Sequence, residues 1–316
     1  MGTNLSEVRG KHELLERLQE LRKRHRAVLL GHYYVPPEVQ DACDYVGDSL
    51  GLSRQAAESD ADVIVFCGVH FMAETASVLA PDRRVLIPSL DAGCSLAESI
   101  TGHDVAQWKA ANPDGIVISY VNTTAEVKAY TDCCCTSANA LLVVQQYADA
   151  KKILFLPDKN LGHYIMRKTG ISMEIWDGAC HVHDRFSEAL IQARMAEYPE
   201  AEVLVHPESA GAWRDEIFGN PRVFIGSTTG MIKRAASSSA KQFLVVTEQG
   251  TLHQMQREAP GKELILVGPE AYCEYMKMMT LERVVRCLET GIHEVKVPAD
   301  IAKRAANSIE RMLSIG

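Results

Sequence analysis

Nine short runs of β-branched and other apolar residues recur along the chain, and each is followed by a stretch with helical spacing. The runs span residues 27–30, 63–67, 85–88, 116–120, 153–156, 203–206, 223–226, 243–247 and 264–267. Because they are continuously apolar instead of alternating, they are typical of parallel strands in sheets covered by helices on both faces. The sequence therefore predicts an α/β protein, with a further helix over residues 11–25 ahead of the first strand.

Length and charge exclude several classes of protein. The 316 residues, 47% of them hydrophobic, are enough for two or three domains. The formal net charge is −8 and no segment is densely basic, so we expect no nucleic-acid partner. The apolar runs are far shorter than the ~20 residues of a membrane span, and the first eleven residues are polar. We therefore expect no membrane association and a cytoplasmic location.

Polar side chains gather directly after the predicted strands. His32 and Tyr34 follow the first strand, Tyr120 follows the fourth, and His206 and Glu208 follow the sixth. In open α/β sheets, ligands bind beyond the carboxyl ends of the strands. The pattern therefore indicates a catalytic face.

The cysteines are the most informative residue type. None of the nine forms a C-x-x-C pair, which excludes zinc ribbons and thioredoxin-type motifs, and reduced thiols are expected in the cytosol. Cys94, Cys180 and Cys273 are 86 and 93 residues apart, and each lies just beyond a strand-like or turn segment. The spacing indicates three similar α/β units of roughly 90 residues, each contributing one thiol. Three converging thiolates would suit a 4Fe-4S cluster with one open iron, whereas three separately buried cysteines are the alternative.

Two further segments invite interpretation. Ser227, Thr228 and Thr229 form a small-residue loop that opens a helix, which could hold a phosphate or carboxylate or could be an ordinary N-capped turn. The run 133–135 consists of three cysteines. Adjacent residues on a regular backbone point in divergent directions, so we interpret these three as packing residues and not as a ligand cluster.

A series of short motifs, in order along nearly the whole chain, resembles the quinolinate synthase family. The motifs are His32-Tyr33-Tyr34, Gly47-Asp48-Ser49, His70-Phe71-Met72-Ala73-Glu74-Thr75-Ala76, Tyr120-Val121-Asn122-Thr123, Thr136-Ser137-Ala138-Asn139, Pro157-Asp158-Lys159-Asn160-Leu161-Gly162, Cys180-His181-Val182-His183, His206-Pro207-Glu208 and Gly226-Ser227-Thr228-Thr229-Gly230. The resemblance implies three similar three-layer α/β/α domains around a pseudo-threefold axis, with a 4Fe-4S cluster at their junction. We accordingly expect domains at residues 1–101, 102–186 and 187–294, with a C-terminal helix at 295–316 packing on the first.

The resemblance also implies an activity and a set of site residues. The activity is the condensation of iminoaspartate with dihydroxyacetone phosphate to quinolinate, releasing phosphate and water, in NAD biosynthesis. An aspartate oxidase or dehydrogenase would supply the iminoaspartate. The cluster ligands would be Cys94, Cys180 and Cys273, and the open iron would act as a Lewis acid. The residues lining the substrate cavity would be His32, Tyr34, Ser49, Tyr120, Asn122, Ser137, His183, His206, Glu208, Ser227, Thr228 and Thr229.

Enolisation and dehydration require an acid/base pair. We assign the proton shuttle to Glu208, with Tyr34, Tyr120 and His183 as further catalytic residues. Two alternative functions stay open from the sequence: an aconitase-like hydro-lyase acting on another polyacid, and an iron-sulfur electron carrier. A carrier has little need for so many polar residues after its strands.

Overall fold

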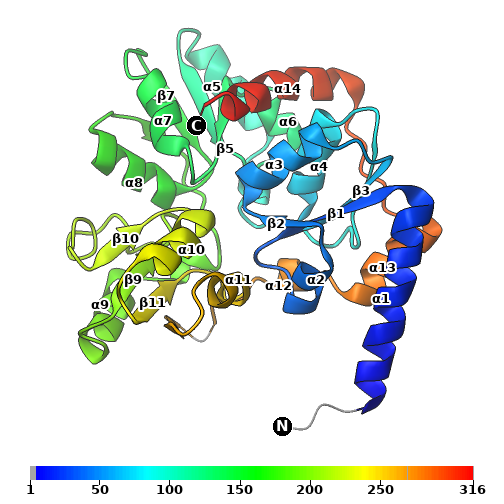
Figure 1. The fold of residues 1–316 in the computed structure, drawn as a ribbon. Coiled ribbons are helices and arrows are strands. Elements are labelled where there is room, and N and C mark those ends of the chain that lie inside the picture. The colour runs from blue at the N-terminus through cyan, green and yellow to red at the C-terminus, as the bar shows by residue number, and fades with distance from the viewer. Residues whose placement is uncertain (1–4, 269, 316) are drawn as a thin grey trace. The chain divides into compact units, whose positions relative to one another are not determined.

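The computed structural model describes residues 5–268 and 270–315 (Figure 1). The chain divides into two compact units. The first unit runs up to Gly93 and resumes over Glu274–Pro298, and the second comprises Cys94–Cys273 and the segment from Ala299 onward. Three four-stranded parallel sheets are distributed between them, one in the first unit and two in the second. Each sheet is flanked by helices, as the sequence predicts for three-layer α/β/α architecture.

The first unit contains sheet 1, which has the strand order β2-β1-β3-β4. Its elements are α1 (Leu5–His25), β1 (Ala27–His32), α2 (Pro37–Ala42), β2 (Tyr45–Gly47), α3 (Ser49–Glu58), β3 (Val63–Cys67), α4 (His70–Leu79), β4 (Arg84–Leu86), α12 (Glu274–Lys277) and α13 (Leu281–Thr290). The long helix α1 packs against α13, although the two are far apart in sequence (Figure 1).

The second unit contains sheets 2 and 3. Sheet 2 has the order β6-β5-β7-β8, and its segment comprises a 3-10 turn (Ala97–Ser99), α5 (Gly102–Ala111), β5 (Ile116–Tyr120), α6 (Ala125–Lys128), β6 (Cys133–Cys135), α7 (Ala140–Gln146), β7 (Ile153–Leu156), α8 (Lys159–Thr169) and β8 (Glu174–Ile175). Sheet 3 has the order β10-β9-β11-β12, and its segment comprises a 3-10 turn (His183–Arg185), α9 (Glu188–Glu197), β9 (Glu202–Val205), β10 (Val223–Ile225), α10 (Thr228–Ser237), β11 (Gln242–Val246), α11 (Thr251–Glu258) and β12 (Glu263–Leu266).

The three sheets repeat one topology. In each, the first strand of the repeat lies between the second and the third, and the fourth strand forms an edge. The connections to the second and third strands leave in opposite directions, so the carboxyl ends of the first and third strands flank a topological switch point, where α/β sheets bind ligands. The repeat predicted from the spacing of three cysteines is therefore present in the strand order of all three sheets.

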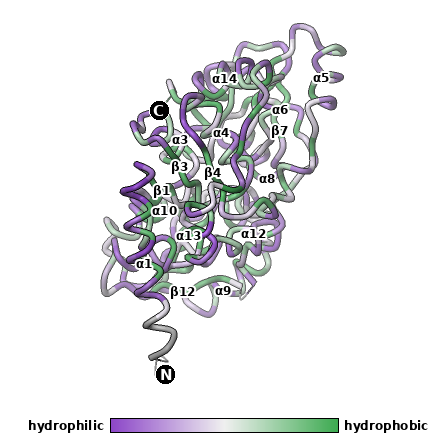
Figure 2. Tube along the Cα trace, turned by 90° about the vertical axis from the view of Figure 1, so that its right-hand side faces the viewer, coloured by the Kyte–Doolittle hydropathy of each residue, from purple (hydrophilic) through white to green (hydrophobic). Residues whose placement is uncertain are grey.

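The strands form the buried layer of each repeat. All residues of β3 and β7 are buried, and most of β9 and β11. Burial on both faces explains why the runs are continuously apolar. Within the described residues, no helix is both long and apolar enough to cross a bilayer (Figure 2).

The last helix corrects one prediction. The sequence assigns the segment 295–316 to the first domain, but α14 (Ala299–Leu313) packs against β6 and α6 of sheet 2. Figure 1 shows this red helix beside the green elements of that sheet. Ser308 Oγ donates to the carbonyl oxygen of Lys128 at 2.9 Å, and Asn139 Nδ2 donates to that of Ile315 at 2.8 Å. The apolar face of α14 thus covers the cysteine-rich edge strand β6.

Candidate functional site

The three predicted cluster cysteines occupy equivalent places in their repeats. Each follows the fourth strand of its sheet, and one backbone hydrogen bond recurs two residues before each cysteine. A backbone amide between the third strand and the first turn of the next helix donates to that carbonyl. The three bonds run from His70 to Ala92, from Lys159 to Gly178 and from Gln249 to Ala271, each at 2.8 Å. The topology therefore presents Cys94, Cys180 and Cys273 on loops of the same construction.

Two of these cysteines, Cys94 and Cys180, lie on loops that are hydrogen-bonded to each other. Ser95 Oγ and His181 Nδ1 lie 2.8 Å apart, so the residues directly after Cys94 and Cys180 are hydrogen-bonded to each other. Burial raises the pKa of the Cys94 thiol to about 12, and the charge of Cys273 raises it further. Burial likewise raises the pKa of Cys180, to which the charges of Glu208 and Cys94 add. Thiols in such a place ionise when a metal supplies the opposing charge, and sulfur is the ligand that iron-sulfur clusters take.

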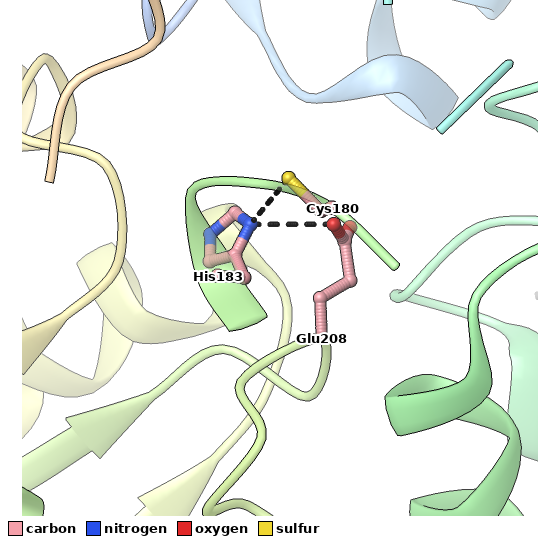
Figure 3. A group of neighbouring side chains, drawn as sticks. All are labelled: Cys180, His183 and Glu208. Atoms are coloured by element: carbon pink, nitrogen blue, oxygen red, sulfur yellow. Dashed lines mark hydrogen bonds and ion pairs between the residues drawn. The ribbon is translucent and has the colours of Figure 1, made fainter. Parts of the chain in front are cut away.

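Glu208 lies at the centre of a buried polar group beside Cys180. His183 Nδ1 is 3.2 Å from Glu208 Oε2 and 3.3 Å from Cys180 Sγ, as Figure 3 shows. His206 Nδ1 lies 3.7 Å from Glu208 Oε1, and Tyr120 donates its hydroxyl to the same oxygen. Cys180, His183 and Glu208 each offer a ligand atom, and these atoms lie within 4.8 Å of one another. The group can therefore bind a metal and can hold a proton next to it.

The local folding of the chain explains why these side chains meet. Tyr120 ends β5, whereas His206 and Glu208 follow β9 directly, so all three lie at carboxyl ends of central strands. His183 begins the 3-10 turn after Cys180, and its Nε2 lies 3.0 Å from Thr247 Oγ1 at the end of β11. The imidazoles of His183 and His206 stack with their centroids 4.6 Å apart. Segments from both sheets of the second unit thus define one polar centre.

Opposing effects set the pKa of Glu208. Burial alone would raise it, but the charges of His183 and His206 and the hydrogen bonds from His183 and Tyr120 lower it to about 2. Glu208 is therefore a carboxylate at neutral pH. A carboxylate with so low a pKa is a weak base, so a proton that it accepts returns readily to a neighbouring imidazole or phenol.

The small-residue loop after β10 forms the capped start of a helix. Ser227 is the N-cap of α10, with its Oγ accepting the Gly230 N–H at 3.2 Å. Thr228 and Thr229 follow in the first turn, where backbone N–H groups point out of the helix. Strand β10, which leads into this helix, pairs with β9, which leads to His206 and Glu208. The helix start and these two residues therefore follow neighbouring strands.

Asn122 and Ser137 follow the two paired strands β5 and β6 of sheet 2. Asn122 Oδ1 is buried and makes no hydrogen bond within the described chain. Lys128, fully buried, donates to the carbonyl oxygens of Val121 and Thr123 on either side of Asn122. This lysine thus fixes the loop that carries the amide, a contact that no sequence motif revealed.

His32, Tyr34 and Ser49 belong to the first unit. His32 and Tyr34 are buried, and their rings meet edge-on with centroids 4.4 Å apart. The Tyr34 amide donates to His32 Nδ1 at 3.2 Å, and Lys277 donates to the Tyr34 carbonyl oxygen. Ser49 begins α3. His32 ends the first strand of sheet 1, Tyr34 follows it, and Ser49 follows the second strand, as polar residues do in the other two repeats.

Two buried carboxylates are absent from the predicted site residues. Asp158 lies two residues after the end of β7, and Glu248 lies two residues after the end of β11; both are completely buried. Asp158 Oδ2 accepts the Cys180 N–H and Glu248 Oε1 accepts the Cys273 N–H, each at 3.2 Å. The sequence shows that both residues follow a third strand. It does not show their hydrogen bonds to the cysteines, because these form only when the fourth strand brings the cysteine loop back beside the third.

The cysteine run 133–135 forms the buried strand β6, which agrees with its interpretation as packing. Cys134 Sγ donates to Ser308 Oγ of α14 at 3.4 Å, and Cys133 Sγ contacts its neighbour's carbonyl oxygen. All three residues lie in the core of sheet 2.

Comparison with known proteins identifies the family. The family model described as "Quinolinate synthetase A protein" matches residues 16–314. The chain belongs to the quinolinate synthetase A family. It is 48% identical to the quinolinate synthase of Pyrobaculum aerophilum over 95% of this chain and 98% of that protein. It is 46% identical to the quinolinate synthase of a Thermus thermophilus strain over 99% of this chain and 100% of that protein, and 47% identical to that of a Synechococcus strain over 93% and 92%. The family predicted from the motifs is confirmed.

Proposed function

We propose that this protein condenses iminoaspartate with dihydroxyacetone phosphate to quinolinate, releasing phosphate and water, in de novo NAD biosynthesis. Membership of the quinolinate synthetase A family supports the reaction, since curated relatives across almost their whole length carry the name quinolinate synthase. The observation that carries the proposal is the placement of Cys94, Cys180 and Cys273 on equivalent loops, beside the buried Glu208 centre.

The donor set fits an iron-sulfur cluster. Three thiols within one unit provide the soft ligands of such a cluster, and the bond between Ser95 and His181 brings two of their loops together. A 4Fe-4S cluster bound by three cysteines keeps one iron open, which supplies a Lewis acid for carboxylate and hydroxyl oxygens. We assign its ligation to Cys94, Cys180 and Cys273.

The chain's own residues perform the proton transfers in this proposal. Glu208, ionised at neutral pH, accepts a proton during enolisation and becomes neutral; His183 and His206 stabilise its carboxylate form before it accepts the proton and after it has returned it. Tyr120 donates to the same carboxylate and can pass a proton to a leaving hydroxyl. Tyr120 and His183 lie within hydrogen-bond reach of Glu208, and His206 Nδ1 lies 3.7 Å from it, so a relay through Glu208 needs little rearrangement.

Substrate anions require donors around this relay. The start of α10, with Ser227, Thr228 and Thr229, is the proposed site for a phosphate or carboxylate. The Oδ1 atom of Asn122, which has no partner within the described chain, can accept a hydrogen bond from a substrate hydroxyl or imine N–H instead of binding an anion. The family resemblance also assigns substrate binding to Ser137, His32, Tyr34 and Ser49, which stays a prediction. Iminoaspartate must come from an oxidation of aspartate, so an aspartate oxidase or dehydrogenase is the expected functional partner.

The test is an anaerobic preparation supplied with iminoaspartate and dihydroxyacetone phosphate, followed by chromatographic detection of quinolinate. We expect quinolinate only when both substrates and an intact cluster are present. A preparation that holds a cluster, makes no quinolinate and instead dehydrates a phosphate-free hydroxy-dicarboxylate would overturn the proposal in favour of a hydro-lyase.

A further inference from the structure

We propose that Asp158 and Glu248 are positioning residues that hold Cys180 and Cys273 as cluster ligands, and that the described part of sheet 1 has no carboxylate in the equivalent place. This inference rests on the proposed function, because it assumes that the three cysteines hold the cluster. It concerns two carboxyl side chains to which neither the family motifs nor the acid/base relay gives a role.

Asp158 connects a helix start to a cysteine. Its Oδ1 accepts the Leu161 N–H at 2.7 Å, which caps α8, and its Oδ2 accepts the Cys180 N–H at 3.2 Å. The backbone around it is fixed as well, because the Gly178 N–H donates to the Pro157 carbonyl oxygen at 3.1 Å. Asp158 thus links the end of β7 to the loop of the second cysteine through both of its oxygens. Burial, and the charge of Glu208 after it, raise the pKa of this carboxyl well above its ordinary value.

Glu248 repeats this arrangement in sheet 3. Its Oε2 accepts the Gly250 N–H at 2.6 Å next to the start of α11, and its Oε1 accepts the Cys273 N–H at 3.2 Å. Asp158 and Glu248 hold the same place in their repeats. Each directly precedes the residue, Lys159 or Gln249, whose backbone N–H donates to the carbonyl oxygen two residues before the cysteine. Side chains of different length thus make the same hydrogen bond to the cysteine N–H. This indicates that both repeats require that hydrogen bond.

Sheet 1, as far as the structure describes it, lacks this carboxylate. The residue directly before His70 is Val69, which is buried and makes no side-chain hydrogen bond as the N-cap of α4. The recurring backbone bond, from His70 to Ala92, is present there as in the other repeats. The repeat common to all three loops is therefore the backbone bond alone, and the carboxylate is an addition at two of them.

A completely buried carboxyl group is costly unless its oxygens are hydrogen-bonded. Here both oxygens of each carboxyl accept backbone N–H groups, so the side chain fixes the backbone of the ligand residue itself. It also occupies the cysteine N–H, which is then unavailable to a cluster sulfur; hydrogen bonds to sulfur are one determinant of cluster potential. Residues that orient a metal ligand typically change metal affinity about 10- to 100-fold when replaced.

The experiment measures how fast iron leaves the cluster-loaded protein to a ferrous chelator under anaerobic conditions. Asp158→Asn and Glu248→Gln keep the size of each side chain but leave one accepting oxygen instead of two. We expect each to release iron about 10- to 100-fold faster than the parent protein, with a shifted cluster reduction potential. Asp158→Glu and Glu248→Asp, which keep a double acceptor, should restore most of the slow release.

Two matched controls separate positioning from general loosening. Asp104→Asn removes a carboxylate that also accepts a backbone N–H, from Thr101 at the start of α5, but contacts no cysteine among the described residues. Val69→Thr alters the equivalent residue of sheet 1 without removing a carboxylate. Both should release iron at the parental rate.

The outcomes distinguish this inference from the proposed function. A parent protein that binds no cluster refutes the proposed function. A parent that binds one, together with Asp158→Asn and Glu248→Gln variants that release iron at the parental rate and keep its potential, overturns the inference alone. If Asp158→Asn does not fold, Glu248→Gln decides the matter by itself.

Discussion

Replacing Glu208 with glutamine keeps the size of the side chain and removes its charge. The surroundings lower the Glu208 pKa from an ordinary 4.5 to about 2, despite burial that acts in the opposite direction. At 1.36 kcal/mol per pKa unit, that difference corresponds to about 3 kcal/mol in favour of the carboxylate over a neutral group. The glutamine oxygen can still accept from Tyr120, but its NH2 group would face His183 in place of an anion.

We therefore expect Glu208→Gln to lower the turnover number about 10²- to 10⁴-fold, the usual contribution of a general base, with little change in iron content. Initial rates of quinolinate formation at saturating substrate, divided by the iron and sulfide bound per chain, measure this. Glu200→Gln makes the same chemical change at an exposed position and should have no effect. A Glu208→Gln protein with an intact cluster and a turnover number within about threefold of the parent would refute the assignment of the proton shuttle.

Three further results are expected. The stability that the Glu208 carboxylate contributes should be complete above its ordinary pKa of 4.5 and should be lost as the pH falls toward 2. The unfolding free energies of the parent and of Glu208→Gln, measured with urea on cluster-free samples, should therefore differ less below pH 5. Asn139→Ala should lower the unfolding free energy by about 2–4 kcal/mol, because the Asn139 amide donates to two backbone carbonyl oxygens at the end of α14 and accepts one backbone N–H. An unchanged urea midpoint would contradict this prediction. Gly178→Ala should lower the unfolding free energy by about 1–3 kcal/mol and reduce the cluster content, because a Cβ would lie 2.5 Å from both the Pro157 carbonyl oxygen and Ser99 Oγ. Full iron binding in that variant would contradict this prediction.

The fold could be predicted from the sequence to the extent that its strands are continuous apolar runs. All nine predicted strands are present, because each lies in a sheet layer between helices, where an apolar run is favoured. The three strands that were missed, β2, β6 and β8, are edge strands of two or three residues. Such segments are shorter than a recognisable pattern, and β6 consists of cysteines, which carry no strong strand preference.

The site could be predicted in part, for a related reason. Cys94, Cys180 and Cys273 were recognisable because their spacing reflects the repeat, and Glu208 because it directly follows a strand. Asp158 and Glu248 follow strands too, but their role depends on a contact with a loop more than twenty residues later. Lys128 was not recognisable either, since its acceptors are backbone carbonyl oxygens, which leave no trace in residue identity.

The central claim is that three repeat-related cysteines hold one cluster, and iron and sulfide analysis of single variants tests it most directly. Cys94→Ala, Cys180→Ala and Cys273→Ala are compared with the parent and with Cys287→Ala, a buried cysteine of α13 that serves as the matched control. We predict about four irons and four sulfides per chain in the parent and in Cys287→Ala, and loss of both in each of the other three. A parent without bound iron and sulfide, or full cluster content in any one of those three variants, would contradict the account.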